Sequence, residues 1–213
     1  MTTASRPRVA RGRRATRPSG DDRELAILET AERLLDERPL ADISVDALAK
    51  GAGISRPTFY FYFPSKDAVL FTLLQRVIGQ ADADIEALMA NPPHDRDAFW
   101  RAAIGVFFST FRAHRVMVGP ATVARYTDPA VRDLWAEFMQ KCVDHTTTVI
   151  EAVRARGEAP DNMPAPELST SLNLLNEAVM TASFARQTPA LAEDRVLDNL
   201  VHIWLNAIYG DRL

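Results

Sequence analysis

Basic, hydroxyl and aromatic side chains follow one another closely between residues 56 and 66. We expect the outer face of one short helix to carry several of these groups, from Arg56, Thr58, Tyr60, Phe61 and Tyr62. Guanidinium and hydroxyl groups can bond to phosphates or base edges, and ring faces can pack on sugars and thymine methyls. A solvated helix seldom carries so many aromatic residues unless they meet another surface. The pattern therefore predicts contact with nucleic acid.

Two short helices and a tight turn must position these groups. Ser44 is a good N-cap for the first helix, and Gly51 and Gly53 are expected to end it, because glycine accepts a left-handed backbone. Ser55 can cap the second helix, with Pro57 in its first turn. This is the helix-turn-helix arrangement, whose second helix lies in the DNA major groove.

The aromatic run also has a structural interpretation, as the core of a small domain. Phe59 and Phe63 lie one turn apart and are predicted to pack inward, with Ile54 just ahead of them. For Tyr60 and Tyr62 we favour the outward, DNA-facing interpretation. Lys66, at the start of the following helix, is placed for a phosphate contact.

The segment 53–66, Gly-Ile-Ser-Arg-Pro-Thr-Phe-Tyr-Phe-Tyr-Phe-Pro-Ser-Lys, resembles the signature of TetR-family transcriptional regulators. The resemblance extends more loosely over most of the chain, and segments 20–28, 138–141 and 201–204 closely resemble one mycobacterial repressor of that family. It implies that two positions, Ser44 and Lys66, touch the DNA backbone. The positions implied to face DNA are Arg56, Pro57, Thr58, Tyr60, Phe61 and Tyr62.

Charge is distributed unevenly along the 213 residues. The net charge is −3, but residues 1–20 hold six arginines and no acid, so the remaining chain carries −9. Proline and glycine make this arm a poor helix, and we expect it to be disordered in the free protein and able to order along DNA phosphates. An inert solvated tail is the alternative.

Helical spacing of apolar residues recurs along the rest of the chain and strand patterns are absent, which predicts an all-α protein. We expect a basic arm over residues 1–21, a three-helix helix-turn-helix DNA-binding head over 22–66, and a larger helical ligand-binding and dimerisation domain over 67–213. The expected helices span roughly 22–37, 67–90, 95–116, 121–126, 129–156, 167–187 and 194–209. Ser65 and Asp128 are expected to cap two of them, and Gly119 and Pro120 to end a third. Gly105, inside the helix over 95–116, is expected to leave a gap for a neighbouring backbone or a ligand.

Aromatic and sulfur-bearing stripes mark several helices of the larger domain. Such stripes are more often core than ligand site, but polar residues on one face of an apolar helix need partners, which a cavity could supply. By resemblance, several of these positions line a long hydrophobic channel, although Cys142, His145 and Thr181 replace expected aromatic residues. The predicted ligand-binding set is Trp100, Ile104, Phe107, Phe111, Trp135, Phe138, Met139, Cys142, Thr146, Asn173, Asn176, Glu177 and Trp204.

The last two expected helices carry apolar residues on more than one face, so the surplus face needs a partner. The resemblance implies that they pair with their copies as a four-helix homodimer interface. A two-fold dimer would present two reading helices to successive major grooves, about 34–36 Å apart. We expect a repressor of operator DNA that an elongated hydrophobic small molecule releases.

Two other classes of function remain as alternatives. One is an enzyme, but the four histidines lie on separate segments without metal-ligand spacing, and no third group orients Cys142 and His145. No metal site, catalytic residue or cofactor is therefore predicted. The other is a helical small-molecule-binding protein that does not bind DNA. Without an export signal or an 18-residue apolar run, and with a single cysteine, we expect a cytoplasmic protein with no membrane partner.

Overall fold

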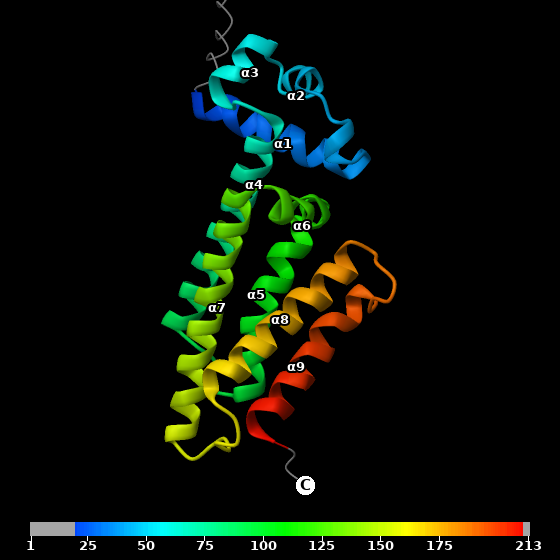
Figure 1. The fold of residues 1–213 in the computed structure, drawn as a ribbon. Coiled ribbons are helices and arrows are strands. Elements are labelled where there is room, and N and C mark those ends of the chain that lie inside the picture. Colours follow the sequence, from blue (N-terminus) through cyan, green and yellow to red (C-terminus); the bar gives the residue numbers. More distant parts are fainter. Residues whose placement is uncertain (1–19, 211–213) are drawn as a thin grey trace, which may run out of the picture.

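Helices make up the regular structure of residues 20–210, the range that the computed structural model describes (Figure 1). This range contains no β-strand, so the all-α prediction is confirmed. Almost all of the predicted basic arm, residues 1–21, lies outside the described residues. In chain order, the elements are α1 (Gly20–Glu37), the 3-10 turn η1 (Leu40–Asp42), α2 (Val45–Gly51), α3 (Arg56–Tyr62), α4 (Lys66–Ala90), α5 (Arg96–Ala113), the 3-10 turn η2 (Arg115–Met117), α6 (Val118–Thr127), α7 (Pro129–Ala155), α8 (Ala165–Phe184) and α9 (Glu193–Tyr209).

The helices α1, α2 and α3 gather at one end of the molecule as a small head (Figure 1). Their core includes Ile27, Leu34 and Leu48, together with Val69 from the start of α4. Phe59 is fully buried and Phe63 nearly so, which confirms that these two rings pack inward. The head is thus held by apolar burial from all three helices and from the first turns of α4.

Side-chain caps fix where the short helices begin. The hydroxyl oxygens of Ser44, Ser55 and Ser65 accept hydrogen bonds from backbone N–H groups three residues ahead, at the starts of α2, α3 and α4. The carboxylate of Asp128 caps α7 by accepting from the backbone N–H of Ala130, two residues ahead, with Pro129 at the first helical position. These four caps were predicted from sequence, because such side chains satisfy otherwise unpaired donors.

The two glycines near the end of α2 have different roles. Gly53 has a φ of +67°, as expected for a residue just past a helix end. Gly51 does not end α2 by its backbone conformation, since it is still helical. A Cβ added at Gly51 would lie 2.4 Å from Cγ2 of the buried Thr30, so this glycine allows α1 and α2 to approach closely.

The long helix α4 leads from the head into a larger helical domain built from α5 to α9 (Figure 1). The fold is therefore an N-terminal helix-turn-helix head and a C-terminal helical domain. Trp100, Ile104, Leu200 and Trp204 lie in the main core of this domain, where α5 packs against α9. We expected Gly119 and Pro120 to end a helix. They lie instead in the first turn of α6, where the missing N–H of proline costs nothing.

Gly105 lies inside α5, where we expected it to make room for a neighbouring backbone or a ligand. A Cβ at this position would meet only Cδ2 of Leu197, at 4.0 Å, which is ordinary contact. Gly105→Ala is therefore expected to stabilise the protein by about 1 kcal/mol, because alanine is the better helix former. Thermal unfolding should show a rise in Tm of about 2–4 °C.

Gly51→Ala is the matched comparison for this prediction. The same change should lower Tm, because its methyl group would collide with Thr30. A fall in Tm for Gly105→Ala would show that the small residue is needed at the contact between α5 and α9.

Candidate nucleic-acid interface and ligand pocket

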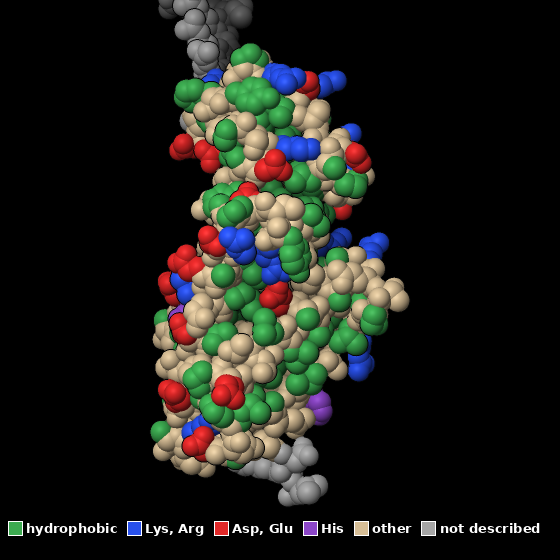
Figure 2. Space-filling model, in the orientation of Figure 1, with side chains coloured by type: hydrophobic (Ala, Val, Ile, Leu, Met, Phe, Trp, Pro, Cys, Tyr) green, Lys and Arg blue, Asp and Glu red, His purple; other side chains and the backbone are tan. Residues whose placement is uncertain are grey.

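The outer face of α3 presents aromatic and basic side chains to solvent. Phe61 is 82% exposed and Tyr60 is 46% exposed, although neighbouring Phe59 is fully buried. On the face seen in Figure 2, apolar and basic side chains lie together at the end of the molecule where Figure 1 places α2 and α3. Two rings left in water beside positive charge form a surface suited to bases, sugars and phosphates.

Arg56 is held in place at the first turn of α3. Its guanidinium donates to Oδ2 of Asp46 at 3.0 Å and to the hydroxyl of Tyr60 at 3.4 Å. The hydrogen bond that Arg56 donates to Tyr60, followed by the negative charge of Asp46, raises the pKa of Arg56 above its ordinary value. Arg56 thus remains a fixed positive charge beside the Tyr60 ring, whose centroid lies 5.8 Å from its Cζ.

The other predicted DNA-facing residues differ in exposure. Pro57 is exposed, while the hydroxyl of half-buried Thr58 lies 2.8 Å from that of the cap residue Ser55. Tyr62 is also half-buried and packs against the core of the head, with its ring 5.1 Å from that of Phe61. Tyr62 therefore has a structural role as well as a partly open surface.

Lys66 has a role that its sequence position did not reveal. Its ammonium group donates to the carbonyl oxygens of Leu40, Ala41 and Ile43, at 2.6, 2.9 and 3.1 Å. It thereby holds the chain that leads into the cap of α2. A shallow groove runs beside it and is lined by residues 41–45, 60 and 64–66, which include the N-terminal caps of α2 and α4. Unpaired N–H groups at helix N-termini attract anions, so the groove is suited to a phosphate.

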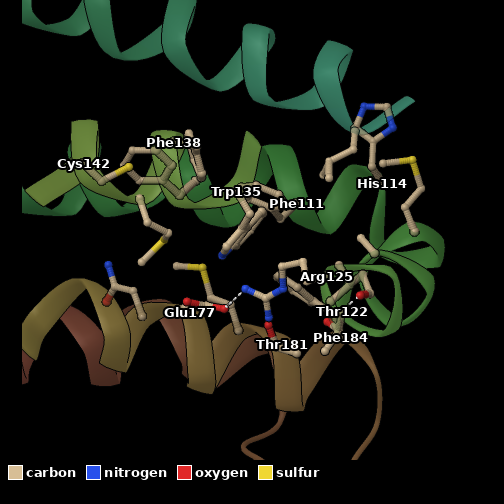
Figure 3. Close-up of a pocket in the computed structure, with 18 of the residues that line it drawn as sticks. Phe111, His114, Thr122, Arg125, Trp135, Phe138, Cys142, Glu177, Thr181 and Phe184 are labelled. Atoms are coloured by element: carbon tan, nitrogen blue, oxygen red, sulfur yellow. Dashed lines mark hydrogen bonds and ion pairs between the residues drawn. The ribbon is translucent and has the colours of Figure 1, made fainter. Parts of the chain in front are cut away.

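A mostly apolar pocket lies in the larger domain, between α4, α5, α6, α7 and α8 (Figure 3). Its apolar side chains come from all five helices and from η2. Along α8 it extends from Asn173 to Phe184, which corresponds to about 16 Å of helix. Its lining residues are Leu74, Phe107, Phe111, His114, Met117, Val118, Ala121, Thr122, Arg125, Trp135, Phe138, Met139, Cys142, Asn173, Asn176, Glu177, Met180, Thr181 and Phe184.

Four aromatic rings form one wall of the pocket. The ring of Phe138 lies 5.9 Å from Phe107, 6.0 Å from Phe111 and 5.4 Å from Trp135. Phe111 and Trp135 also meet edge to face, at 5.8 Å. Offset and edge-to-face packing of this kind makes a continuous apolar surface along α5 and α7.

An ion pair between α6 and α8 lies in the lining of the pocket. Arg125 of α6 donates to Oε1 of Glu177 on α8, and both side chains are largely buried (Figure 3). The Arg125 guanidinium carbon also lies 4.8 Å from the centroid of the Trp135 ring. The indole Nε1 of Trp135 is buried and has no hydrogen-bond partner among residues 20–210. The pocket thus has a polar centre with apolar side chains on either side.

The two asparagines of α8 face other protein groups as well as the pocket. The Nδ2 of Asn173 donates to Oγ1 of Thr146 and to the carbonyl oxygen of Ser169. The Oδ1 of Asn176 accepts from Nε1 of Trp204 at 2.9 Å. Protein groups therefore satisfy much of the hydrogen bonding for which we expected a cavity to be needed.

Comparison with known proteins places this geometry in a family. The profile described as "Bacterial regulatory proteins, tetR family" matches residues 27–73, and "Transcriptional regulator EthR, C-terminal domain" matches residues 100–210. The HTH-type transcriptional regulator EthR of Mycobacterium tuberculosis is 59% identical over 99% of this chain and 99% of its own. EthR of Mycolicibacterium smegmatis is 50% identical over 99% of this chain and 97% of its own.

The chain belongs to the TetR family of bacterial transcriptional regulators. The predicted likeness to a mycobacterial member is confirmed. TetR-family regulators bind operator DNA and small-molecule ligands, typically as dimers. These relatives are regulators and not enzymes, so the enzyme alternative is set aside.

Solved structures of TetR-type regulators share the fold. A transcriptional regulator from Saccharomonospora viridis in complex with choline superposes with a TM-score of 0.73 at 21% identity, over 87% of this chain and 96% of its own. The ketosteroid transcriptional regulator KstR2 of M. tuberculosis gives 0.65 at 17% identity, over 89% and 96% of the two chains. At these identities the likeness concerns the arrangement of helices alone.

The ligand residues predicted for this TetR-family chain divide into two groups. Four of them lie outside the pocket lining: Trp100, Ile104, Thr146 and Trp204. The packing of α5 against α9 buries Trp100, Ile104 and Trp204 in the core, and Thr146 accepts a hydrogen bond from Asn173. The residues that do line the pocket are Phe107, Phe111, Trp135, Phe138, Met139, Cys142, Asn173, Asn176 and Glu177.

Sequence reasoning missed several lining residues, above all His114, Met117 and Arg125. The signal for Arg125 was Glu177: a carboxylate on an apolar helix face is buried only beside a cation, so an arginine or lysine on a facing helix was to be expected. Two of the three replacements noted in the sequence, Cys142 and Thr181, line the pocket, while His145 is exposed.

Cys142 has the environment of a packing residue. Burial, followed by the negative charge of Asp82, raises the pKa of its thiol to about 12. At neutral pH the side chain is therefore a neutral thiol and a poor nucleophile. None of the helices within residues 20–210 combines the length and the apolarity needed to span a bilayer.

Proposed function

We propose that this TetR-family protein is a repressor that binds operator DNA as a homodimer and is released by an elongated hydrophobic small molecule. The observation that carries the proposal is that the apolar pocket and the DNA-reading head share side chains. Within this function, we assign residues 22–66 to DNA binding and 67–213 to ligand binding and dimerisation, and we place the protein in the cytoplasm, with its operator.

The exposed face of α3 supports the DNA-binding part of the proposal. Tyr60 and Phe61 would meet the major groove, with Arg56 at the start of the helix and Pro57 and Thr58 beside it. Ser44 and the groove beside Lys66 would hold a backbone phosphate. Half-buried Tyr62 would contribute its open edge.

Three side chains connect the pocket with the head. Met117 lines the pocket and is also buried in the core of the head. His114 lines the pocket, and its Nδ1 lies 2.5 Å from Oε1 of Glu32 on α1. Phe111, one turn before His114, packs against the cores of both the head and the larger domain. A ligand that moves these residues would bias the position of the head, because packed cores shift between discrete arrangements.

The outer faces of α8 and α9 support dimerisation. Exposed positions at helical spacing on α8 are Ser171, Leu174 and Ala178, and on α9 they include Asn199 and His202. None of these side chains carries a fixed charge, and Leu174 is 53% exposed. Exposed charged residues lie in the first two turns of both helices, and the uncharged positions that follow them suit a self-complementary interface.

Leu174→Glu is expected to weaken the dimer at least about 100-fold, because two-fold symmetry would bury two unpaired carboxylates at one interface. Sedimentation equilibrium should then show a mass near that of the single chain at micromolar concentration. Met163→Glu is the control, since Met163 is similarly exposed, at 45%, but lies in the loop before α8. A Leu174→Glu protein that remains dimeric would place the interface elsewhere.

A mobility-shift assay on DNA upstream of the protein's own gene and its neighbours tests the proposed function. We expect one fragment to be shifted in the presence of excess nonspecific DNA, with affinity that falls steeply as salt rises. A protein that shifts every fragment equally, or none, would contradict operator binding.

A further inference from the structure

The ion pair at the centre of the pocket has consequences for the kind of ligand that fits. Figure 3 shows Arg125, Glu177 and Trp135 pointing toward one another, between Phe138 and Cys142 on one side and Phe184 on the other. Arg125 brings a positive charge into a largely buried setting, and Glu177 cancels it. The pocket therefore offers no net charge to a ligand, although a guanidinium lies in its wall.

We propose that Glu177 is a specificity-determining residue that makes the pocket select uncharged amphiphiles over carboxylates. The proposal rests on the proposed function, because it concerns the ligand of the same pocket. The favoured ligand is a long apolar molecule with a neutral oxygen, such as an alcohol or a ketone. Its oxygen lies at the Trp135–Arg125–Glu177 centre, and its hydrocarbon fills the apolar ends.

Electrostatics disfavours a carboxylate in this pocket. A carboxylate that reached Arg125 would have to displace Glu177 or share the guanidinium with it. Either arrangement leaves one excess negative charge in a setting with few compensating donors, and burying an unpaired charge is costly. The nearby His114 is already engaged with Glu32 on the head.

A neutral oxygen meets no such obstacle. The buried N–H of Trp135 lacks a partner among the described residues, and it can donate to an alcohol or carbonyl oxygen after a small rotation of the ring. Thr181, on the same side of the pocket as Glu177, adds a hydroxyl group without charge. The Arg125–Glu177 pair remains intact throughout.

The test compares decan-1-ol with decanoate, two probes with the same chain and different head groups. Titrations at pH 7.5 follow tryptophan fluorescence, since Trp135 lines the pocket. The wild-type protein is expected to bind decan-1-ol at least roughly 10-fold more tightly than decanoate, because decanoate would add an uncompensated negative charge to the largely buried Arg125–Glu177 pair.

Glu177→Gln should change this selectivity. The glutamine keeps an oxygen acceptor for Arg125 but removes the compensating charge, so decanoate binding is expected to strengthen at least roughly 10-fold. Binding of decan-1-ol should change little. In the double variant Arg125→Gln/Glu177→Gln the gain for decanoate should disappear, because the cation is gone. Glu167→Gln, an equal change in charge at an exposed position in the first turn of α8, should behave as the wild type.

The outcomes separate the two proposals. If the wild-type protein binds neither probe, the proposed apolar ligand site is wrong, and the selectivity proposal fails with it. If both probes bind equally well, or if Glu177→Gln leaves their ratio unchanged, only the role of Glu177 is overturned. The wild-type comparison needs no variant, so it holds as a test whether or not Glu177→Gln folds.

Discussion

Replacing Tyr60 and Phe61 together by alanine is expected to weaken operator binding at least about 30-fold, since each lost base contact is worth about 1–3 kcal/mol. Stability should change little, because Phe61 is 82% exposed and Tyr60 nearly half exposed. Fluorescence anisotropy with labelled operator DNA measures the first effect and thermal unfolding the second.

Tyr126→Ala is the matched control for the loss of exposed aromatic surface. Tyr126 is 84% exposed but lies on α6, outside the head. It should leave both operator affinity and Tm unchanged. Retention of operator binding by the double variant would show that the exposed rings of α3 are not the DNA-reading surface. A large fall in its Tm would show that they are part of the core.

Replacing Lys66 by alanine is a poorer test of DNA contact than replacing Tyr60 and Phe61. Alanine at this position would remove three hydrogen bonds to the backbone carbonyl groups of Leu40, Ala41 and Ile43. Loss of DNA binding would then combine a missing phosphate contact with a disordered entry to α2.

Glu32→Gln is expected to reduce the coupling between ligand and operator while leaving ligand binding unchanged. Glu32 contacts His114 but does not itself line the pocket. Coupling free energies of about 1–3 kcal/mol correspond to a loss of operator affinity of roughly 5- to 150-fold on ligand binding. In the variant we expect saturating decan-1-ol to change operator affinity by less than about twofold.

Glu29→Gln provides the control for this prediction. Glu29 is an exposed residue of α1, one turn before the contact with His114, and its replacement alters the charge of the head by the same amount. It should preserve the full ligand effect. An undiminished ligand effect in Glu32→Gln would mean that the signal passes through Met117 and Phe111 alone.

Local sequence rules predicted the features that local chemistry controls. Ser44, Ser55 and Ser65 were identified as caps because a cap needs only a hydroxyl at the right offset. The burial of Phe59 and Phe63 followed from one-turn spacing. The same reasoning could not distinguish Phe107, which lines the pocket, from Trp100, which lies in the core, because both occupy one stripe of α5.

Contacts between distant parts of the chain were the features that sequence reasoning missed. Arg125 and Glu177 lie 52 residues apart, and Glu32 and His114 lie 82 apart. The periodicity of the sequence predicts neither pair, because each forms only when two helices that are far apart in the chain pack together. The amides of α8 were singled out correctly as unusual, but their partners, Thr146 and Trp204, could not be assigned without the fold.

Coupling between the hydrophobic pocket and the DNA-reading head is measured by operator affinity with and without a ligand. Anisotropy titrations with an operator fragment at fixed salt would compare the protein alone with the protein saturated with decan-1-ol. Coupling of the two sites predicts specific binding that weakens at least about 5-fold when the alcohol is bound. Specific binding that does not change while the alcohol demonstrably occupies the protein would contradict it.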